Sequence, residues 1–340
     1  MELCSAITVS AIAAFFMYII LMKEGEKAMK YPRKIAIGFQ EGTCPLRCAK
    51  CYAFSENARG QKKPAKMPME RAIWLIDEIA HMEQVPSIQP HIYTEPFAND
   101  DLHEIIQKCL DYNICMSIIS NGILLNQDWL DFLLNKLDRR YTLSFSLDAV
   151  TQDTYEKVRG AYELGKIEER INYLISNRGN SGPRVGVNFS VEEDNYAEVK
   201  DFLNKWKYKV DAVRINTVFD FDKRIPPRFR KEEDDRNIKC AYLDEVMTID
   251  ADGQVRTCQY DAFGDTALGN VFEEGILNVW NGDKISGLRR RQERGELETD
   301  NFCYGCDASK GMDFKEIESD EFLIKKASQS IYYNYRGEIV

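Results

Sequence analysis

From Lys34 onward, short apolar runs alternate with amphipathic segments, and this alternation restricts the chain to a small set of folds. Segments such as 69–79 and 129–137 place apolar residues three and four positions apart, as an amphipathic helix does. Six βα units with right-handed crossovers form a parallel sheet, and six strands curl into a partial barrel rather than a closed barrel of eight. The expected strands cover residues 34–40, 87–93, 115–120, 141–147, 184–191 and 212–219.

The ten cysteines of the chain are unevenly distributed. Cys44, Cys48 and Cys51 form a compact loop directly after the first expected strand, where the functional residues of such a sheet gather. Seven clustered cysteines without a cleavable signal indicate metal ligands in a reducing compartment, so we expect a cytoplasmic protein. The second group lies in the last third of the chain and comprises Cys240, Cys258, Cys303 and Cys306.

The first three cysteines form an incomplete metal site. Cubane iron–sulfur clusters are usually held by four cysteines, so a three-cysteine loop leaves one iron free to bind another molecule. Zinc is the alternative, but structural zinc sites usually pair two CxxC hooks. No further cysteine lies within 50 residues after Cys51, and the loop therefore favours a cluster.

The spacing Cys44-Pro-Leu-Arg-Cys48-Ala-Lys-Cys51 resembles the signature of the radical S-adenosylmethionine (radical SAM) superfamily. The resemblance implies a [4Fe–4S] cluster on these cysteines, with SAM chelating the open iron through its amino and carboxylate groups. It also implies that Glu95 contacts the SAM amino group, although Tyr93 and Thr94 replace the usual two glycines. Further SAM contacts that the resemblance implies are Tyr52 near adenine, Ser120 in a Ser-Asn-Gly turn, and Ser146 and Arg159 at the ribose and carboxylate. Lys50 departs from the family, which commonly has an aromatic residue there.

The last third of the chain carries a second resemblance. Residues 246–258 read as a hairpin with Asp252-Gly253 as its turn, followed by Leu-Gly-Asn and Trp280 landmarks. This order, ending in Cys303-Tyr-Gly-Cys306, resembles the auxiliary-cluster domain of the SPASM/twitch group. Because no cysteine follows Cys306, the resemblance implies the shorter twitch form, with Cys240, Cys258, Cys303 and Cys306 holding one auxiliary [4Fe–4S] cluster. Structural zinc on the same cysteines is the alternative.

These observations predict an α/β protein, a partial (βα)6 TIM-like barrel (radical SAM core) with a small C-terminal twitch domain and an N-terminal hydrophobic helix. Leu3 to Met22 carries no charge and is long enough to cross a bilayer, and the lysines after it would keep the remainder cytoplasmic. A membrane anchor, an interfacial helix and an upstream start codon are the open alternatives for it. The expected divisions are a hydrophobic segment 1–30, a core 31–232, an auxiliary domain 233–312 and a C-terminal tail 313–340.

The net charge of −10 argues against nucleic-acid binding, which requires a basic surface. The resemblance implies reductive cleavage of SAM to a 5′-deoxyadenosyl radical, with electrons from an external flavodoxin- or ferredoxin-type donor. We expect net oxidation of a small polar or carbohydrate-like molecule. The alternatives are a peptide-modifying maturase, whose N-terminal recognition domain would exceed the 43 residues before Cys44, and a membrane-tethered iron–sulfur scaffold or sensor. The candidate bases are Glu192, Glu193, Asp220 and Asp222.

Overall fold

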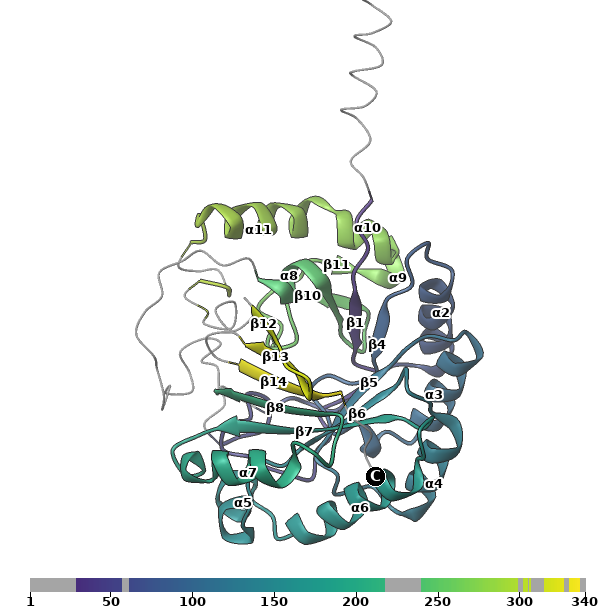
Figure 1. Ribbon diagram of the computed structural model, residues 1–340. Coiled ribbons are helices and arrows are strands. Elements are labelled where there is room, and N and C mark those ends of the chain that lie inside the picture. The colour runs from purple at the N-terminus through teal and green to yellow at the C-terminus, as the bar shows by residue number, and fades with distance from the viewer. Residues whose placement is uncertain are drawn as a thin grey trace, which may run out of the picture.

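Six parallel strands in chain order form the centre of the protein (Figure 1). The computed structural model describes residues 29–56, 61–217, 240–298, 302–304, 306, 315–326 and 330–336. β1 pairs with β4, and β5 to β8 pair in order, while Ile88 of β4 bridges in parallel to Met116 just before β5. The predicted partial six-stranded barrel is therefore confirmed. Its strands are β1 (Lys34–Ile37), β4 (Ser87–Gln89), β5 (Ser117–Ser120), β6 (Thr142–Ser146), β7 (Arg184–Val191) and β8 (Ala212–Thr217).

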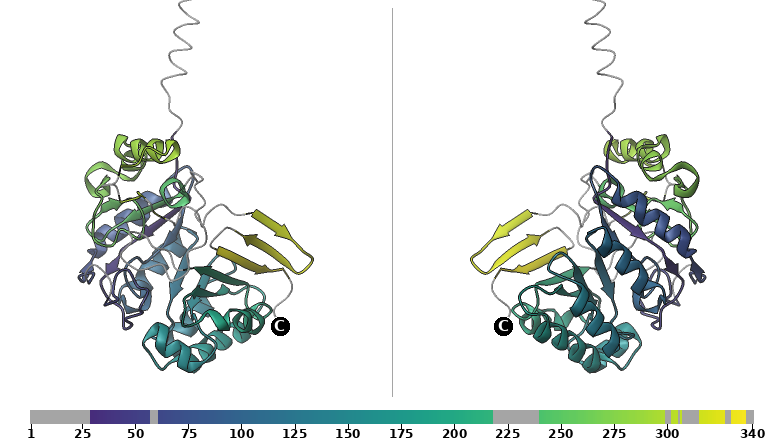
Figure 2. Two further views of the ribbon diagram at one scale, coloured as in Figure 1. Left: turned by 90° about the vertical axis from the view of Figure 1, so that its left-hand side faces the viewer. Right: turned by 90° about the vertical axis from the view of Figure 1, so that its right-hand side faces the viewer.

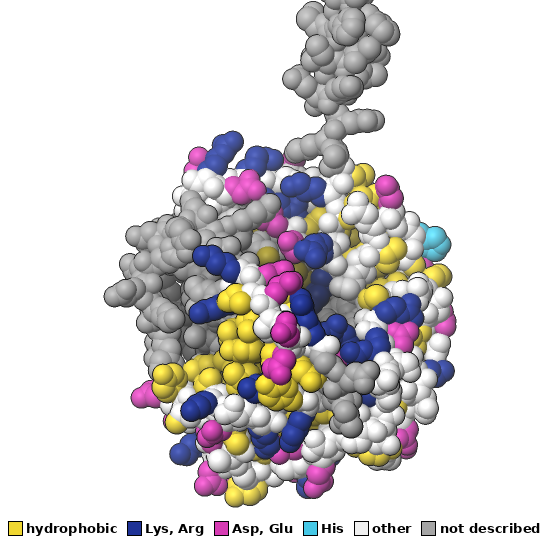
Figure 3. Space-filling view, in the orientation of Figure 1, with side chains coloured by type: hydrophobic (Ala, Val, Ile, Leu, Met, Phe, Trp, Pro, Cys, Tyr) yellow, Lys and Arg dark blue, Asp and Glu magenta, His cyan; other side chains and the backbone are white. Residues whose placement is uncertain are grey.

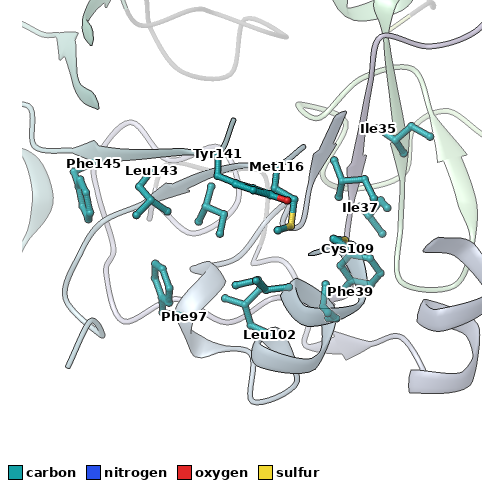
Figure 4. Packing of buried hydrophobic residues seen from close by; sticks show 14 of the residues in the cluster. Ile35, Ile37, Phe39, Phe97, Leu102, Cys109, Met116, Tyr141, Leu143 and Phe145 are labelled. Carbon is teal, nitrogen blue, oxygen red and sulfur yellow. The ribbon is translucent and has the colours of Figure 1, made fainter. Parts of the chain in front are cut away.

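Helices connect the strands and cover the outside of the barrel (Figure 2). Each carries one apolar stripe, and α2 buries Ala72, Leu75, Ile76 and Ile79, the i, i+3, i+4, i+7 spacing of a single helix face. These stripes pack on side chains such as Ile35 and Leu143 from the strands (Figure 4). The helices are α2 (Met69–Ala80), α3 (Leu102–Asp111), α4 (Gln127–Lys136), α5 (Gln152–Arg159), α6 (Leu164–Asn177) and α7 (Val199–Trp206), with 3-10 turns at Pro96–Ala98 and Tyr196–Glu198.

Residues from the last third of the chain extend the barrel sheet beyond β1. β9 (Val246–Ile249) runs parallel to β1, and β10 (Gln254–Arg256) and β11 (Gly269–Asn270) continue the sheet in antiparallel fashion. The predicted hairpin turn is confirmed. Gly253 has a φ of +87°, and a Cβ atom added to it would lie only 2.2 Å from the Phe272 ring, so the turn requires glycine. Helices α8 (Ala241–Glu245), α9 (Val271–Glu274), α10 (Ile276–Asn281) and α11 (Asp283–Arg294) complete this region.

The opposite edge of the barrel is extended by strands from the range expected to be a tail. β14 (Ser330–Tyr335) pairs antiparallel with β8, and β13 (Phe322–Lys326) and β12 (Lys315–Glu318) follow in order. These strands project from the side of the barrel in Figure 2, and hydrophobic side chains gather over them in Figure 3. Both edges of the six-stranded sheet are therefore covered by later parts of the chain.

A two-stranded ribbon of β2 (Gln40–Glu41) and β3 (Ala65–Lys66) flanks the cysteine loop. The hydrophobic run Leu3–Met22 lies outside the described residues. Within the described ranges, no helix is both long and apolar enough to span a bilayer.

Candidate active site

The cysteine loop opens onto a cavity of about 320 Å³ at the carboxyl ends of the barrel strands. The loop lies there because it directly follows β1, and parallel strands all end at the same mouth of a barrel. All eight residues that the sequence places at the SAM-binding cluster line this one cavity: Cys44, Cys48, Cys51, Tyr52, Glu95, Ser120, Ser146 and Arg159. The structure therefore brings together residues that are up to 115 positions apart in the sequence.

Hydrogen-bond donors approach the loop sulfurs from several elements. The Leu46 N–H lies 3.5 Å from Cys44 Sγ, and Asn121 Nδ2 lies 3.7 Å from the same sulfur. Arg159 Nη1 lies 3.6 Å from Cys48 Sγ. Burial raises the pKa of the Cys44 thiol to about 12, so the buried sulfur needs a compensating cation to exist as a thiolate. Such donors stabilise metal-bound thiolates and tune the potential of a cluster.

Glu95 is held rigidly beside this loop. Its carboxylate accepts hydrogen bonds from Ser120 Oγ at 2.6 Å and from the Asn121 N–H at 2.9 Å. Burial nevertheless raises the pKa of Glu95 to about 7, because the charged form has lost its water. The charge of Arg159 acts in the opposite direction and favours the carboxylate, and an ammonium group bound in the cavity would favour it further.

Tyr93, which stands where the family usually has a glycine, has a backbone conformation that glycine adopts readily. Its φ of 50° lies in the left-handed region, which bulky residues rarely adopt. Contacts of both its backbone and its ring stabilise this strained conformation. The Tyr93 carbonyl accepts a hydrogen bond from the Gly42 N–H at 2.8 Å, and the Lys62 ammonium lies 4.5 Å from the centroid of the ring. The turn that presents Glu95 therefore contains a strained tyrosine, which these contacts hold in place.

Lys50, the other departure from the family pattern, belongs to a buried ionic network. Its ammonium contacts Asp148, and it lies 3.3 Å from Glu192 Oε1. Asp148 is fully buried and also receives Arg159 Nη2 at 2.7 Å. The charges of Lys50 and Arg159 keep the pKa of Asp148 below its usual value despite burial. The network joins the cysteine loop to α5 and β7, so an ion pair connects the loop to the barrel at this position.

The four later cysteines lie close to one another behind one wall of the cavity. Cys258 is buried, and its thiol pKa is raised first by burial and then by the proximity of Cys303, Cys306 and Cys240. Cys240 and Cys306 pack against the Tyr242 and Cys258 side chains. The structure thus brings these cysteines together from three separate segments of the chain.

Aromatic side chains connect the two cysteine groups. The Tyr52 ring, next to Cys51, lies 5.2 Å from the Tyr260 ring, which in turn lies 5.2 Å from the Tyr242 ring. The hydroxyls of Tyr242 and Tyr260 are 3.0 Å apart. Tyr260 also lines the cavity, together with Gln259. The segment that follows Cys258 is therefore part of the cavity wall.

The sequence did not single out the polar residues in the deeper part of the cavity. They lie on or after the strands and comprise Gln89, His91, Asn188, Ser190, Arg214, Asn216 and Gln259. The His91 Nε2 accepts the Ile119 N–H at 2.9 Å, so the proton of the neutral ring lies on Nδ1. Burial lowers the pKa of His91 to about 3, aided by the charge on Lys34. His91 is consequently a neutral hydrogen-bond donor. In the sequence, its place near the end of an expected strand was the only sign that it would line the site.

The candidate bases fall in different environments. Glu192 is buried and paired with Lys50, whereas Glu193 is exposed to solvent. Asp220 and Asp222 lie outside the described residues. Among the described candidates, only Glu192 is buried next to the loop network.

Fold and site together define an α/β barrel protein with one cysteine set inside the barrel mouth and a second set behind its wall. A family model of the radical SAM superfamily matches residues 42–205, and one of the SPASM iron–sulfur cluster-binding domain matches residues 240–307. The chain belongs to the radical SAM superfamily and carries a C-terminal SPASM-type domain. An enzyme of this kind binds SAM at one [4Fe–4S] cluster and carries auxiliary iron–sulfur clusters as well.

Solved structures share this fold at low sequence identity. BtrN in complex with AdoMet and 2-DOIA is 16% identical with a TM-score of 0.54, covering 82% of this chain and 94% of that chain. Streptococcus suis SuiB bound to precursor peptide SuiA is 15% identical with a TM-score of 0.58, covering 82% and 70%. The AdoMet-bound anSMEcpe is 13% identical with a TM-score of 0.61, covering 81% and 86%. An uncharacterised protein of Treponema pallidum is 22% identical over 69% of this chain and 70% of its own length.

The residues present suit the groups that this family binds. Three loop thiols face a cavity that also contains a buried, unpartnered Arg159 Nε and the Glu95 carboxylate, and these charges complement the carboxylate and ammonium of SAM. Within the described ranges, no group of three or more His, Cys, Asp or Glu side chains is arranged to hold a metal ion.

Proposed function

We propose that the protein oxidises a small polar or carbohydrate-like molecule by radical SAM chemistry. The observation that carries the proposal is the cavity wall formed by Gln259 and Tyr260, directly after Cys258. Tyr260 lines the cavity and also packs against the cluster of Tyr242 and Cys258, with Cys240 and Cys306 beside them. A substrate in the cavity would therefore lie between the two cysteine sets.

The proposed ligands of the SAM-binding cluster are Cys44, Cys48 and Cys51, and those of one auxiliary cluster are Cys240, Cys258, Cys303 and Cys306. When bound, the loop cluster supplies the electron that splits SAM into methionine and a 5′-deoxyadenosyl radical, and the auxiliary cluster supplies an electron acceptor. With four cysteines on the auxiliary cluster, no iron is left for substrate, which favours a role in electron transfer.

The SAM contacts follow from charge and hydrogen bonding in the cavity. Glu95 is placed to accept the SAM amino group, and Arg159 to receive its carboxylate with the Nε that has no other partner. Ser120 fixes one Glu95 oxygen at 2.6 Å and so orients the carboxylate. Ser146 is proposed at the ribose and Tyr52 beside adenine, since both line the same cavity.

Net oxidation removes two hydrogens from the substrate. One would leave as a hydrogen atom from carbon, to form 5′-deoxyadenosine, and the second as a proton to a base. Cys240, Cys258, Cys303 and Cys306 would hold the group that accepts the remaining electron. The chain's own task is to hold the substrate still and exclude water that would quench the radical. His91, as a fixed donor on Nδ1, and the amides of Gln89 and Asn188 can orient hydroxyl groups of a substrate.

The similarity to BtrN, whose structure contains AdoMet and 2-DOIA, supports a small substrate because the alignment covers 94% of that chain. SuiB and anSMEcpe have also been solved with peptides bound, so peptide modification is the competing function. The test supplies the anaerobically reconstituted protein with SAM, a strong reductant, and either the small-molecule or the peptide fraction of a cell extract. The proposal expects 5′-deoxyadenosine formation stimulated by the small-molecule fraction, with a product lighter by two hydrogen atoms. Stimulation confined to the peptide fraction, or a product of unchanged mass, contradicts it.

A further inference from the structure

Arg214 lies on the middle of β8 and lines the deep end of the SAM cavity. It also lines a second cavity of about 420 Å³, whose walls include residues at the start of β6 and β7. Asn188 and Arg214 belong to both cavities, so the two spaces meet at these side chains. A group bound to the Arg214 guanidinium would therefore lie at the floor of the SAM cavity. The proposed SAM site lies above it in the same cavity.

Among the described residues, the neighbours of Arg214 include no carboxylate that forms an ion pair with it. The guanidinium lies 4.9 Å from the centroid of the Tyr332 ring of β14 and interacts with the hydroxyl of Tyr242. Its Nε is buried without a hydrogen-bond partner. Among the ion pairs between described residues, none involves Arg214. Arg214 is half-buried, and the neighbours that act on its charge are the tyrosines Tyr332, Tyr242 and Tyr260. A guanidinium in such surroundings is ordinarily paired with an anion.

The surroundings of Arg214 are also positively charged. Burial, and then the charge of Arg214, lowers the pKa of Lys34 on β1, so the two cations act on each other. The lower cavity is lined by Arg139, Arg140 and Arg184 in addition to Arg214, and the only acid among its described lining residues is Asp211. Asp211 is already bonded to Arg178, to Arg139 at 2.7 Å and to the Val185 N–H at 2.7 Å. The potential at the cavity floor is therefore one that attracts an anion.

We infer that the substrate is a small molecule bearing a carboxylate or phosphate group, which is anchored by Arg214 with the side chains of Asn188 and Asn216 beside it. The planar guanidinium fork matches either oxyanion, and the unpartnered Nε is one of the donors that such a group would fill. The anchored end would lie at the floor, and the rest of the molecule would extend toward the cysteine loop. This inference rests on the proposed function, because it specifies the substrate of the same cavity.

The alternative is that Arg214 only attaches β14 to β8 by stacking on Tyr332. That role needs no ligand and predicts no preference for charge. Two pairs of probes separate the readings, because each pair differs in one anionic group: ribose 5-phosphate against ribose, and gluconate against sorbitol. Binding is measured by calorimetry on the anaerobically reconstituted full-length protein with SAM at saturation, so that the carboxylate site of SAM is already filled.

The inference expects the anionic member of at least one pair to bind ten times more tightly than the neutral member. Arg214→Gln should reduce that binding at least tenfold, and Arg214→Lys should restore part of it as a point charge. Arg140→Gln is the matched control: Arg140 lines the lower cavity but is 46% exposed and already paired with Asp138, so anion binding should persist. Equal binding within both pairs, including no binding, overturns the anchor. So does full retention in Arg214→Gln, or an equal loss in Arg140→Gln.

The wild-type comparison needs no variant, so it remains decisive if Arg214→Gln fails to fold. The same preparation is assayed for 5′-deoxyadenosine and for oxidised product from the extract fractions. Wild-type protein that prefers the anionic probes but yields no oxidised product contradicts the proposed oxidation and leaves the anchor standing. Oxidation of a small molecule together with indifference to charge contradicts the anchor alone.

Discussion

Asp148 offers a quantitative test of the network that attaches the cysteine loop to the barrel. The carboxylate is fully buried and bonded to Lys50, to Arg159 at 2.7 Å and to the Ser190 N–H at 2.6 Å. Asp148→Asn removes the charge with little change in volume. Its φ of 61° is one that asparagine also tolerates, and the amide oxygen can still accept the Ser190 N–H. The substitution therefore isolates the ionic contribution.

Removing one partner from a buried ion pair costs about 3 to 5 kcal/mol, because the remaining charge is left uncompensated. We expect the lower end, about 3 kcal/mol, since Lys50 retains Glu192 at 3.3 Å. Urea unfolding followed by tryptophan fluorescence, on anaerobic preparations of equal iron content, measures this loss. Asp100 is exposed to solvent, and Asp100→Asn is the control. It should change the free energy of unfolding by less than about 0.5 kcal/mol.

The double variant of Lys50→Met and Asp148→Asn should be less destabilised than the sum of the single variants, by at least about 1 kcal/mol. That coupling distinguishes a direct ion pair from two independent effects. A loss below about 1 kcal/mol in Asp148→Asn, or additivity in the double variant, would refute the network as the attachment of the loop.

Three further predictions concern cofactor binding and stability. Glu95→Gln should weaken SAM binding to the reconstituted protein about 10- to 100-fold by calorimetry, because a hydrogen bond to a charged group is lost; unchanged affinity contradicts the role of Glu95. Cys44→Ala should abolish 5′-deoxyadenosine formation, whereas Cys303→Ala should still produce it in the first turnover, and equal loss in both variants contradicts the division of roles. Asp211→Asn should destabilise the fold by about 3 kcal/mol at pH 7. Since the folded-state pKa of Asp211 is lowered from 3.8, that difference should be present above pH 3.8 and disappear as the pH falls through the folded value; a difference independent of pH contradicts it.

The sequence predicted the barrel well, because the period of apolar residues in each helix and strand can be read from a short stretch of chain. Its six strand ranges each contain the observed strand. The residues proposed for SAM and for the SAM-binding cluster line one cavity, because they lie at or after the ends of strands that share one mouth of the barrel. The sequence could not show that Lys50 pairs with Asp148, 98 positions away, since no local pattern links the two. Arg214 was missed for a related reason: one basic residue inside an apolar strand gives no sign that its neighbours are tyrosines rather than carboxylates.

The strands β12 to β14 illustrate a second limit. Their apolar residues alternate over only a few positions, and from the sequence we expected a tail over 313–340. Pairing of β14 with β8 supplies the missing stabilisation, and it also places Tyr332 beside Arg214. A short strand of this kind is determined by its partner, which lies more than 100 positions earlier in the sequence.

The central claim is that two separate cluster sites flank one cavity, and iron content combined with SAM cleavage tests it most directly. Anaerobically reconstituted wild-type protein should contain about eight irons per chain and form 5′-deoxyadenosine with a strong reductant, because two cubane clusters are proposed. Cys303→Ala should contain about four irons and still cleave SAM. Wild-type protein with only about four irons, or with eight but no 5′-deoxyadenosine, would contradict the account.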